Sequence, residues 1–128
     1  MDARLDPARI LGLQDGDANV LRNAGAIVTE DVLRSLAISR WLLGTRQAFV
    51  IGHVDCGMTR FTNGELRARL RDEAGVDASE IDFLPFGDVD ESVREGVRRI
   101  RGSPLLGDAF AAGGFVYDVR TGRLTEVP

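Results

Sequence analysis

Apolar and polar residues follow one another in blocks that predict both helices and strands. A helical pattern starts after Thr29, a residue type that caps helix N-termini, and continues to Gly44. The next apolar block, Gln47–His53, is continuous, which is typical of a strand buried on both faces in a parallel sheet. The tail of an earlier strand is expected at Asp2–Arg4. Together these blocks predict a strand–helix–strand unit with parallel strands.

The second half of the chain predicts two further helices and a closing hairpin. The charged stretch Asn63–Glu73 indicates a surface helix, and the acidic stretch Gly75–Asp90 an irregular loop. A helix capped by Asp88 or Asp90 follows, with apolar residues at helical spacing. These apolar residues are Val93, Val97 and Ile100. Residues 115–119 and 123–127 predict a β-hairpin. The expected fold is one α/β domain over residues 1–128: a mostly parallel β-sheet flanked by helices, with a C-terminal β-hairpin.

Composition and charge narrow the classes of function. A chain of 128 residues can bury a core without disulfides, and its single cysteine excludes an internal disulfide framework. We therefore expect a reducing, cytoplasmic location. The net charge is −4 and all basic residues are arginine, so no nucleic-acid partner is expected. No apolar run approaches the ~18 residues of a membrane span, so no membrane is expected either.

The one histidine and the one cysteine carry the strongest chemical signal. His53 and Cys56 are separated by two residues, directly after the predicted buried strand. Imidazole and thiolate are both zinc ligands, and a single turn can direct both at one ion. Ligands also bind most often at the ends of buried strands in α/β sheets. A structural interpretation is open as well, namely a small buried thiol beside a histidine whose hydrogen bonds are satisfied.

The same segment has the spacing of a phosphate-binding P-loop. Gly52–Thr59 matches G-x-x-x-x-G-K-[ST] except at Met58, which replaces the lysine, and it also looks like the opening motif of translation GTPases. That lysine neutralises the β- and γ-phosphates, and the chain contains no lysine at all. The sequence therefore argues against a nucleotide site.

Two segments together resemble the active site of the β-class carbonic anhydrases. In that family one segment reads Cys-x-Asp-x-Arg and the other His-x-x-Cys, which Asp2–Arg4 and Ile51–Met58 resemble. The turn Arg22–Gly25 and the closing segment Gly114–Gly122 also resemble the family, in the same order. In the family, the two cysteines and the histidine hold zinc. The resemblance therefore implies Zn²⁺ as cofactor and reversible hydration of carbon dioxide to bicarbonate by zinc hydroxide.

The resemblance also implies a role for each site residue. His53 and Cys56 would be zinc ligands, and Asp2 would either accept a hydrogen bond from the zinc-bound water or ligate the zinc itself. Arg4 would orient Asp2, since arginine's planar fork fits a carboxylate and alternate residues of a strand share a face. Without the resemblance, Asp2 and Arg4 would be an exposed terminal ion pair. A homodimer or higher homo-oligomer is implied too, because the family builds its cleft between subunits.

The chain departs from the family pattern at one ligand. The first cysteine would directly precede Met1 and is absent, as is the helical segment that usually comes before it. Three explanations are open: a fragment, an internal methionine taken as the start, or a degenerate relative. With only His53, Cys56 and Asp2 as ligands, we expect weak zinc binding and impaired activity. Two other functions remain open: a non-catalytic zinc-binding or interaction module, and hydrolysis of carbon disulfide.

Overall fold

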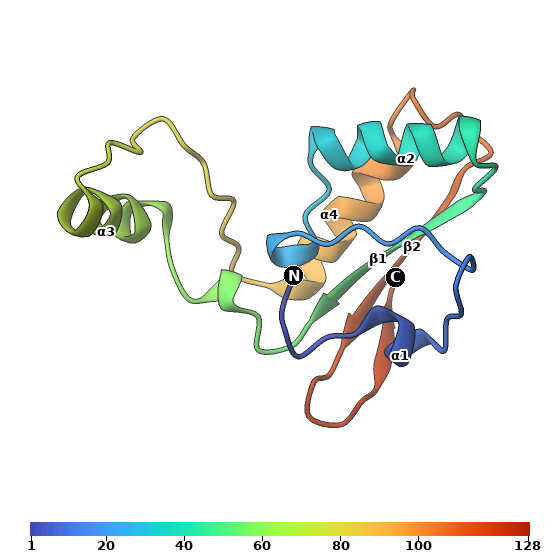
Figure 1. The fold of residues 1–128 in the computed structure, drawn as a ribbon, viewed down its shortest axis with the longest axis horizontal. Coiled ribbons are helices and arrows are strands. Elements are labelled where there is room, and N and C mark those ends of the chain that lie inside the picture. The colour runs from blue at the N-terminus through green and yellow to red at the C-terminus, as the bar shows by residue number, and fades with distance from the viewer.

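The computed structural model describes all residues 1–128 (Figure 1). Its elements, in chain order, are α1 (Pro7–Leu11), η1 (Ala24–Ala26), α2 (Glu30–Leu42), β1 (Gln47–His53), η2 (Gly57–Thr59), α3 (Asn63–Ala74), α4 (Val89–Arg101), β2 (Ala111–Tyr117) and β3 (Leu124–Val127). This arrangement confirms the α/β class with a C-terminal β-hairpin.

A three-stranded sheet in the order β1-β2-β3 lies at the centre of the fold. Strand β1 pairs with β2 in parallel, with His53 opposite Tyr117, and β2 pairs with β3 antiparallel. The sheet is therefore mixed, because the closing hairpin adds an antiparallel strand to a parallel pair. The carboxyl ends of β1 and β2 lie side by side, so the residues that follow His53 emerge at a position where α/β sheets bind ligands.

Helix α4 packs against β1 and β2 and contributes Val93, Val97 and Ile100 to the buried core. Val93 is 1 % exposed and Ile100 is 2 % exposed, which confirms the predicted apolar face. Two strand glycines let the helix approach closely, since a Cβ built on Gly52 or Gly114 would lie within 2.9 Å of Val93 side-chain atoms. Real Cβ atoms do not make such short contacts, so larger residues there would push α4 away from the sheet.

The prediction that β1 is buried on both faces is wrong for one face. Val50 is 4 % exposed and contributes to the core, whereas Phe49, which points the other way, is 53 % exposed. Phe49 packs edge-on against Phe115 of the neighbouring strand, with ring centroids 5.4 Å apart. Because β1 is an edge strand, its side chains away from α4 are only partly covered.

Side-chain caps set the starts of the three long helices, as the sequence predicted for α2 and α4 but not for α3. Thr29 accepts a hydrogen bond from the amide of Val32, and Thr62 forms a reciprocal capping box with Glu65. Of the two caps that the sequence allowed for α4, the structure uses Asp88, whose carboxylate accepts from the amide of Glu91.

The predicted strand at Asp2–Arg4 is wrong, because these residues form a turn. The amide of Leu5 donates to the carbonyl of Asp2 at 3.1 Å, and the amide of Arg4 donates to the Asp2 carboxylate at 2.9 Å. A side chain that bonds to nearby backbone in this way competes with extended structure. Arg22 holds the turn from the other side, donating to the carbonyls of Asp2 and Leu5. The parallel pair is therefore formed by β1 and β2, and not by a strand that precedes α2.

The predicted start of one strand also moves. The hairpin strand β2 begins at Ala111, ahead of the predicted residue 115, because its small residues pair with β1 from Gln47 onward. Helix α3 stands apart from the sheet on an extended connection (Figure 1), and none of its residues is buried.

No helix combines the length and apolar character that a membrane span needs.

Candidate metal centre

His53 and Cys56 lie at the carboxyl end of β1, on a tight turn that buries both side chains. His53 is 7 % exposed and Cys56 is 5 % exposed. The turn is held on one side by the amide of Val54, which donates to the carbonyl of Tyr117 at 2.9 Å. On the other side the Thr59 hydroxyl donates to the carbonyl of Cys56 at 2.8 Å. The sequence therefore placed the two residues correctly at the end of a strand, although only one face of that strand is well buried.

Hydrogen bonding fixes which nitrogen of His53 carries the proton. Nδ1 lies 2.8 Å from the carbonyl oxygen of Val54. A carbonyl can only accept a hydrogen bond, so Nδ1 must be the donor, and the neutral ring presents its lone pair at Nε2. Metal-bound histidines in proteins commonly have this arrangement, in which the second nitrogen donates to a backbone carbonyl.

Asp2 and Arg4 meet despite the different local structure. Arg4 donates from Nε to Asp2 Oδ1 at 3.0 Å and from Nη2 to Asp2 Oδ2 at 2.7 Å, a two-pronged ion pair. These bonds hold the pKa of the Asp2 carboxyl well below its usual range, and the same pairing raises the pKa of Arg4. Asp2 is therefore ionised at neutral pH, and its orientation is fixed by the guanidinium.

The Asp2 carboxylate faces the free nitrogen of His53. Oδ2 of Asp2 lies 3.6 Å from Nε2 of His53, which is longer than a hydrogen bond. Two electron-rich atoms in this position favour a cation near both of them. Nitrogen, sulfur and carboxylate oxygen are also the donor types that zinc prefers in proteins.

The donors fit zinc in kind but do not complete a site. No group of three or more histidine, cysteine, aspartate and glutamate side chains is arranged so that it could hold a metal ion. A catalytic zinc normally has three protein ligands. His53 and Cys56 would therefore need a further ligand, and Asp2 is already bonded to Arg4.

The fold adds Asp55 and Arg60 to this centre, and the sequence did not identify either as a site residue. Arg4 also donates to Asp55, through Nη1 to Oδ2 and through Nη2 to the backbone carbonyl, each at 3.2 Å. Arg60 pairs with the other carboxylate oxygen of Asp55. The only hint in the sequence was the place of Asp55 inside the His-x-x-Cys spacing, because its partner Arg4 is 51 residues away.

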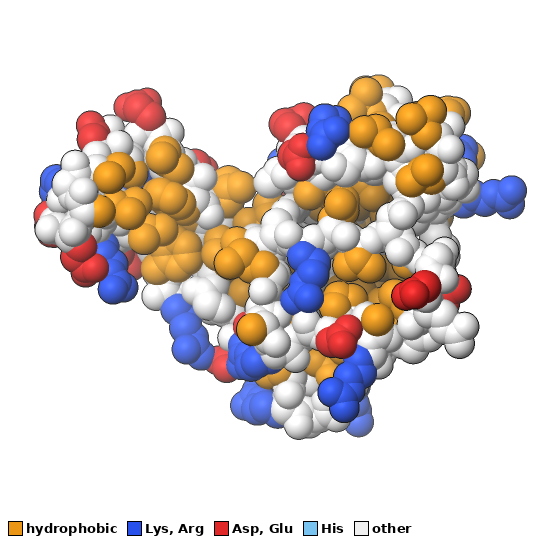
Figure 2. Space-filling view, in the orientation of Figure 1, with side chains coloured by type: hydrophobic (Ala, Val, Ile, Leu, Met, Phe, Trp, Pro, Cys, Tyr) orange, Lys and Arg blue, Asp and Glu red, His pale blue; other side chains and the backbone are white.

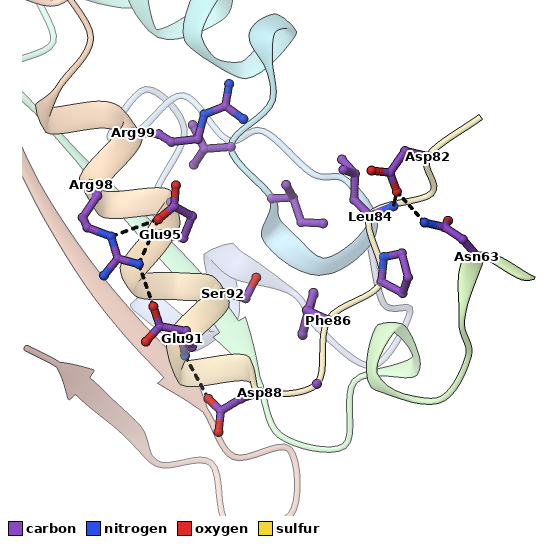
Figure 3. Close-up of a pocket in the computed structure, with 15 residues that line it drawn as sticks. Asn63, Asp82, Leu84, Phe86, Asp88, Glu91, Ser92, Glu95, Arg98 and Arg99 are labelled. Carbon is purple, nitrogen blue, oxygen red and sulfur yellow. Dashed lines mark hydrogen bonds and ion pairs between the residues drawn. The ribbon is translucent and has the colours of Figure 1, made fainter. Parts of the chain in front are cut away.

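A separate cavity of about 590 Å³ lies beside α4 and contains none of the predicted site residues (Figure 3). Its charged side chains are already paired: Arg98 bonds to both Glu91 and Glu95, and Asp88 caps the helix. Asp82 likewise accepts from the amide nitrogen of the Asn63 side chain. The charged groups of the cavity are therefore occupied by pairing or capping, and the centre at His53 is the better candidate site.

Fold and centre together describe an α/β protein with zinc-type donors at the carboxyl end of a strand. Comparison with known proteins agrees with this description. The family model for carbonic anhydrase matches residues 1–79. Beta-carbonic anhydrase 1 of Mycobacterium tuberculosis is 46 % identical over 99 % of this chain and 77 % of its own length.

Two further similarities extend the comparison. The crystal structure of a carbonic anhydrase from Streptococcus mutans superposes with a TM-score of 0.97 at 50 % identity, covering 100 % of this chain and 77 % of that one. A carbon disulfide hydrolase from an Acidianus species is 34 % identical over 98 % of this chain and 73 % of its own length. The chain therefore belongs to the β-class carbonic anhydrase family.

Proposed function

We propose that this protein catalyses the reversible hydration of carbon dioxide to bicarbonate with zinc as its cofactor. The observation that carries this proposal is the ionised Asp2 carboxylate held by Arg4 opposite the free Nε2 of buried His53. Family membership supports the same reaction, since the similar proteins include carbonic anhydrases at 46 % and 50 % identity.

Each residue of the centre has a role in this proposal. His53 and Cys56 would hold zinc through Nε2 and the thiolate, and the chemistry expected of zinc is to lower the pKa of water so that hydroxide is available near neutrality. Asp2 would accept a hydrogen bond from the attacking water, or would itself be a zinc ligand. Arg4 keeps the Asp2 carboxylate ionised and oriented.

We further propose that the 128-residue chain binds zinc weakly and is therefore a poor enzyme. The reason is the incomplete donor set, since two protein ligands leave the ion with too few bonds to offset the loss of its water shell. One cysteine added directly before Met1 would restore the family's Cys-x-Asp-x-Arg spacing.

Zinc content measured after dialysis tests the proposal. We expect about one zinc per chain in the version with the added cysteine and far less in the chain as it stands. Changing His53 to Ala in the extended version should remove the metal again, whereas Asp72→Asn on the distant helix α3 should not. If neither version retains zinc, His53 and Cys56 are structural residues, as in a non-catalytic module. If the chain as it stands holds a full complement, the weak-binding proposal is wrong.

Carbon disulfide is the second candidate substrate, because carbon disulfide hydrolases are among the similar proteins. Their lower identity of 34 % places carbon dioxide first. Steady-state rates of the zinc-loaded extended chain with each substrate separate the two reactions. Activity on carbon disulfide alone would overturn the proposed reaction. Absence of both activities in a zinc-loaded chain would favour a metal-binding or interaction module. The cytoplasmic location stays a prediction.

A further inference from the structure

The carboxylate of Asp55 lies between two arginines, Arg4 and Arg60. One oxygen, Oδ2, accepts from Arg4 Nη1 at 3.2 Å, and the other pairs with Arg60. The backbone carbonyl of Asp55 accepts a second bond from Arg4. The guanidinium of Arg4 is thus held on one side by Asp55 and on the other by Asp2.

This double contact decides where Asp2 can point. A guanidinium is planar and its donors form a rigid fork, so bonds to Asp55 on one side fix the direction of the donors on the other. Asp2 accepts from Nε and Nη2 of that fork, which places its Oδ2 3.6 Å from His53 Nε2. An Arg4 released from Asp55 could rotate about its side-chain bonds and take the Asp2 carboxylate with it.

We propose that Asp55 is a positioning residue, which fixes Arg4 so that the Asp2 carboxylate faces His53. The effect of Asp55 on catalysis rests on the proposed function, whereas its effect on the orientation of Arg4 does not. Arg60 has a supporting part, because it holds the second oxygen of Asp55 and so prevents that carboxylate from turning away. Single exposed ion pairs contribute little, but a linked series of charges can restrict geometry.

The backbone of Asp55 supports this assignment. Its φ is +59°, in the left-handed region that residues other than glycine seldom adopt, although aspartate and asparagine adopt it more often than most. Such conformations are found where the surrounding structure enforces them, often at functional sites. Glycine would suit the backbone better, yet only a carboxylate can bind both arginines. Pairing with Arg4 and Arg60 also lowers the pKa of Asp55, so it is ionised at neutral pH.

The backbone conformation of Asp55 also allows its charge to be removed without disturbing the turn. Asp55→Gly and Asp55→Asn both suit a positive φ, so either change removes the charge without forcing the turn to refold. The measured quantity is the rate at which the Arg4 Nε–H proton, bonded to Asp2, exchanges with water in ¹⁵N-resolved NMR spectra. We expect exchange to accelerate about threefold or more in Asp55→Gly and less in Asp55→Asn, whose amide oxygen can still accept one bond.

Asp72→Asn is the control, because it removes the same charge from an exposed ion pair, with Arg71 on α3, that does not involve Arg4. That change should leave Arg4 exchange as it is. Unchanged Arg4 exchange in both Asp55 variants, with the backbone spectrum still that of the folded protein, would overturn the proposal. An equal acceleration in the Asp72 variant would overturn it too, since the effect would then not belong to Asp55.

The zinc-loaded chain with the added cysteine gives the catalytic readout. Asp55→Asn should lower kcat there, and the same change should have no further effect once Arg4 is replaced by alanine. Equal losses in both backgrounds would show that Asp55 acts independently of Arg4 and would contradict the proposal. If that chain does not hydrate carbon dioxide at all, the proposed function fails, while the exchange rates of Arg4 still decide whether Asp55 positions it.

Discussion

Two single residues determine how closely α4 lies against the sheet. Gly52 of β1 and Gly114 of β2 face the same helix, and a Cβ on either would lie 2.7–2.9 Å from valine methyl groups. These glycines have ordinary backbone conformations, so it is space alone that excludes a side chain. Gly52 directly precedes His53, the last residue of β1.

Gly114→Ala should therefore destabilise the protein. The new methyl group would meet Val93 at 2.7 Å and Val97 at 3.1 Å, and overpacking of this kind typically costs about 1–3 kcal/mol. Chemical denaturation measures the loss in the free energy of unfolding. In a Val93→Ala background, Gly114→Ala should cost less, because the Val93 methyl group that it meets is gone. The neighbouring change Gly113→Ala is the control, because its methyl group would face the exposed Phe49 ring. Equal losses at both glycines would contradict the packing argument.

At the scale of elements, α3 and α4 have similar lengths and similar caps but different surroundings. Helix α4 buries four residues, including Val93 and Ile100, whereas α3 buries none. Helix α3 also packs extensively against no other element. The stability of α4 is therefore part of the global stability, while α3 depends mainly on its own capping box and sequence.

The same type of substitution should consequently act differently in the two helices. Replacing Asp88, the cap of α4, by alanine should lower the global free energy of unfolding by about 1 kcal/mol. Replacing Thr62, the cap of α3, by alanine should leave the unfolding midpoint unchanged. It should instead raise amide hydrogen exchange in α3 by a factor of about five. An equal fall in the global midpoint for both variants would show that α3 is tied to the core.

Several large apolar side chains are exposed to solvent on the surface of the single chain. One group of them, the apolar cluster of Ile38, Trp41, Leu42 and Leu43, lies at the C-terminal end of α2, and apolar side chains cover that part of the surface at the upper right of Figure 2. Trp41 is 63 % exposed, Leu42 is 77 % and Leu43 is 65 %. Contiguous exposed apolar residues of this kind commonly mark a contact with another subunit. We therefore propose a homodimer or a larger homo-oligomer.

Light scattering coupled to size exclusion tests the assembly. We expect a mass of at least two chains, and Leu42→Glu should shift the protein towards the single-chain mass of 13.9 kDa, because a charge at the apolar cluster would have to be desolvated on association. Gln14→Glu adds the same charge at an exposed position away from α2, and should leave the mass unchanged. A single-chain mass for the unaltered protein at micromolar concentration would refute the proposal.

Local features of the chain were predictable because they depend on neighbours in sequence. Thr29 and Thr62 begin helices where a capping side chain precedes apolar or charged helical spacing. The pairing of His53 with Cys56 at a strand end followed from their spacing and from the apolar block before them. The meeting of Asp2 with Arg4 was also predicted, since residues two apart can contact in a strand or in a turn, although the strand itself was wrong.

By itself the sequence thus determined the α/β class, the helix starts, and the residue types of the candidate centre. Only the tertiary structure decided that β1 pairs with β2, that α4 covers one face of that pair, and that Asp55 joins Arg4 to Arg60. The physical reason is the separation along the sequence of the residues that are in contact. Caps and turns arise from contacts between residues a few positions apart, whereas the pairing of β1 with β2 and the Arg4–Asp55 contact join residues 51 or more positions apart. Such contacts form only when the whole chain packs, so no local pattern encodes them.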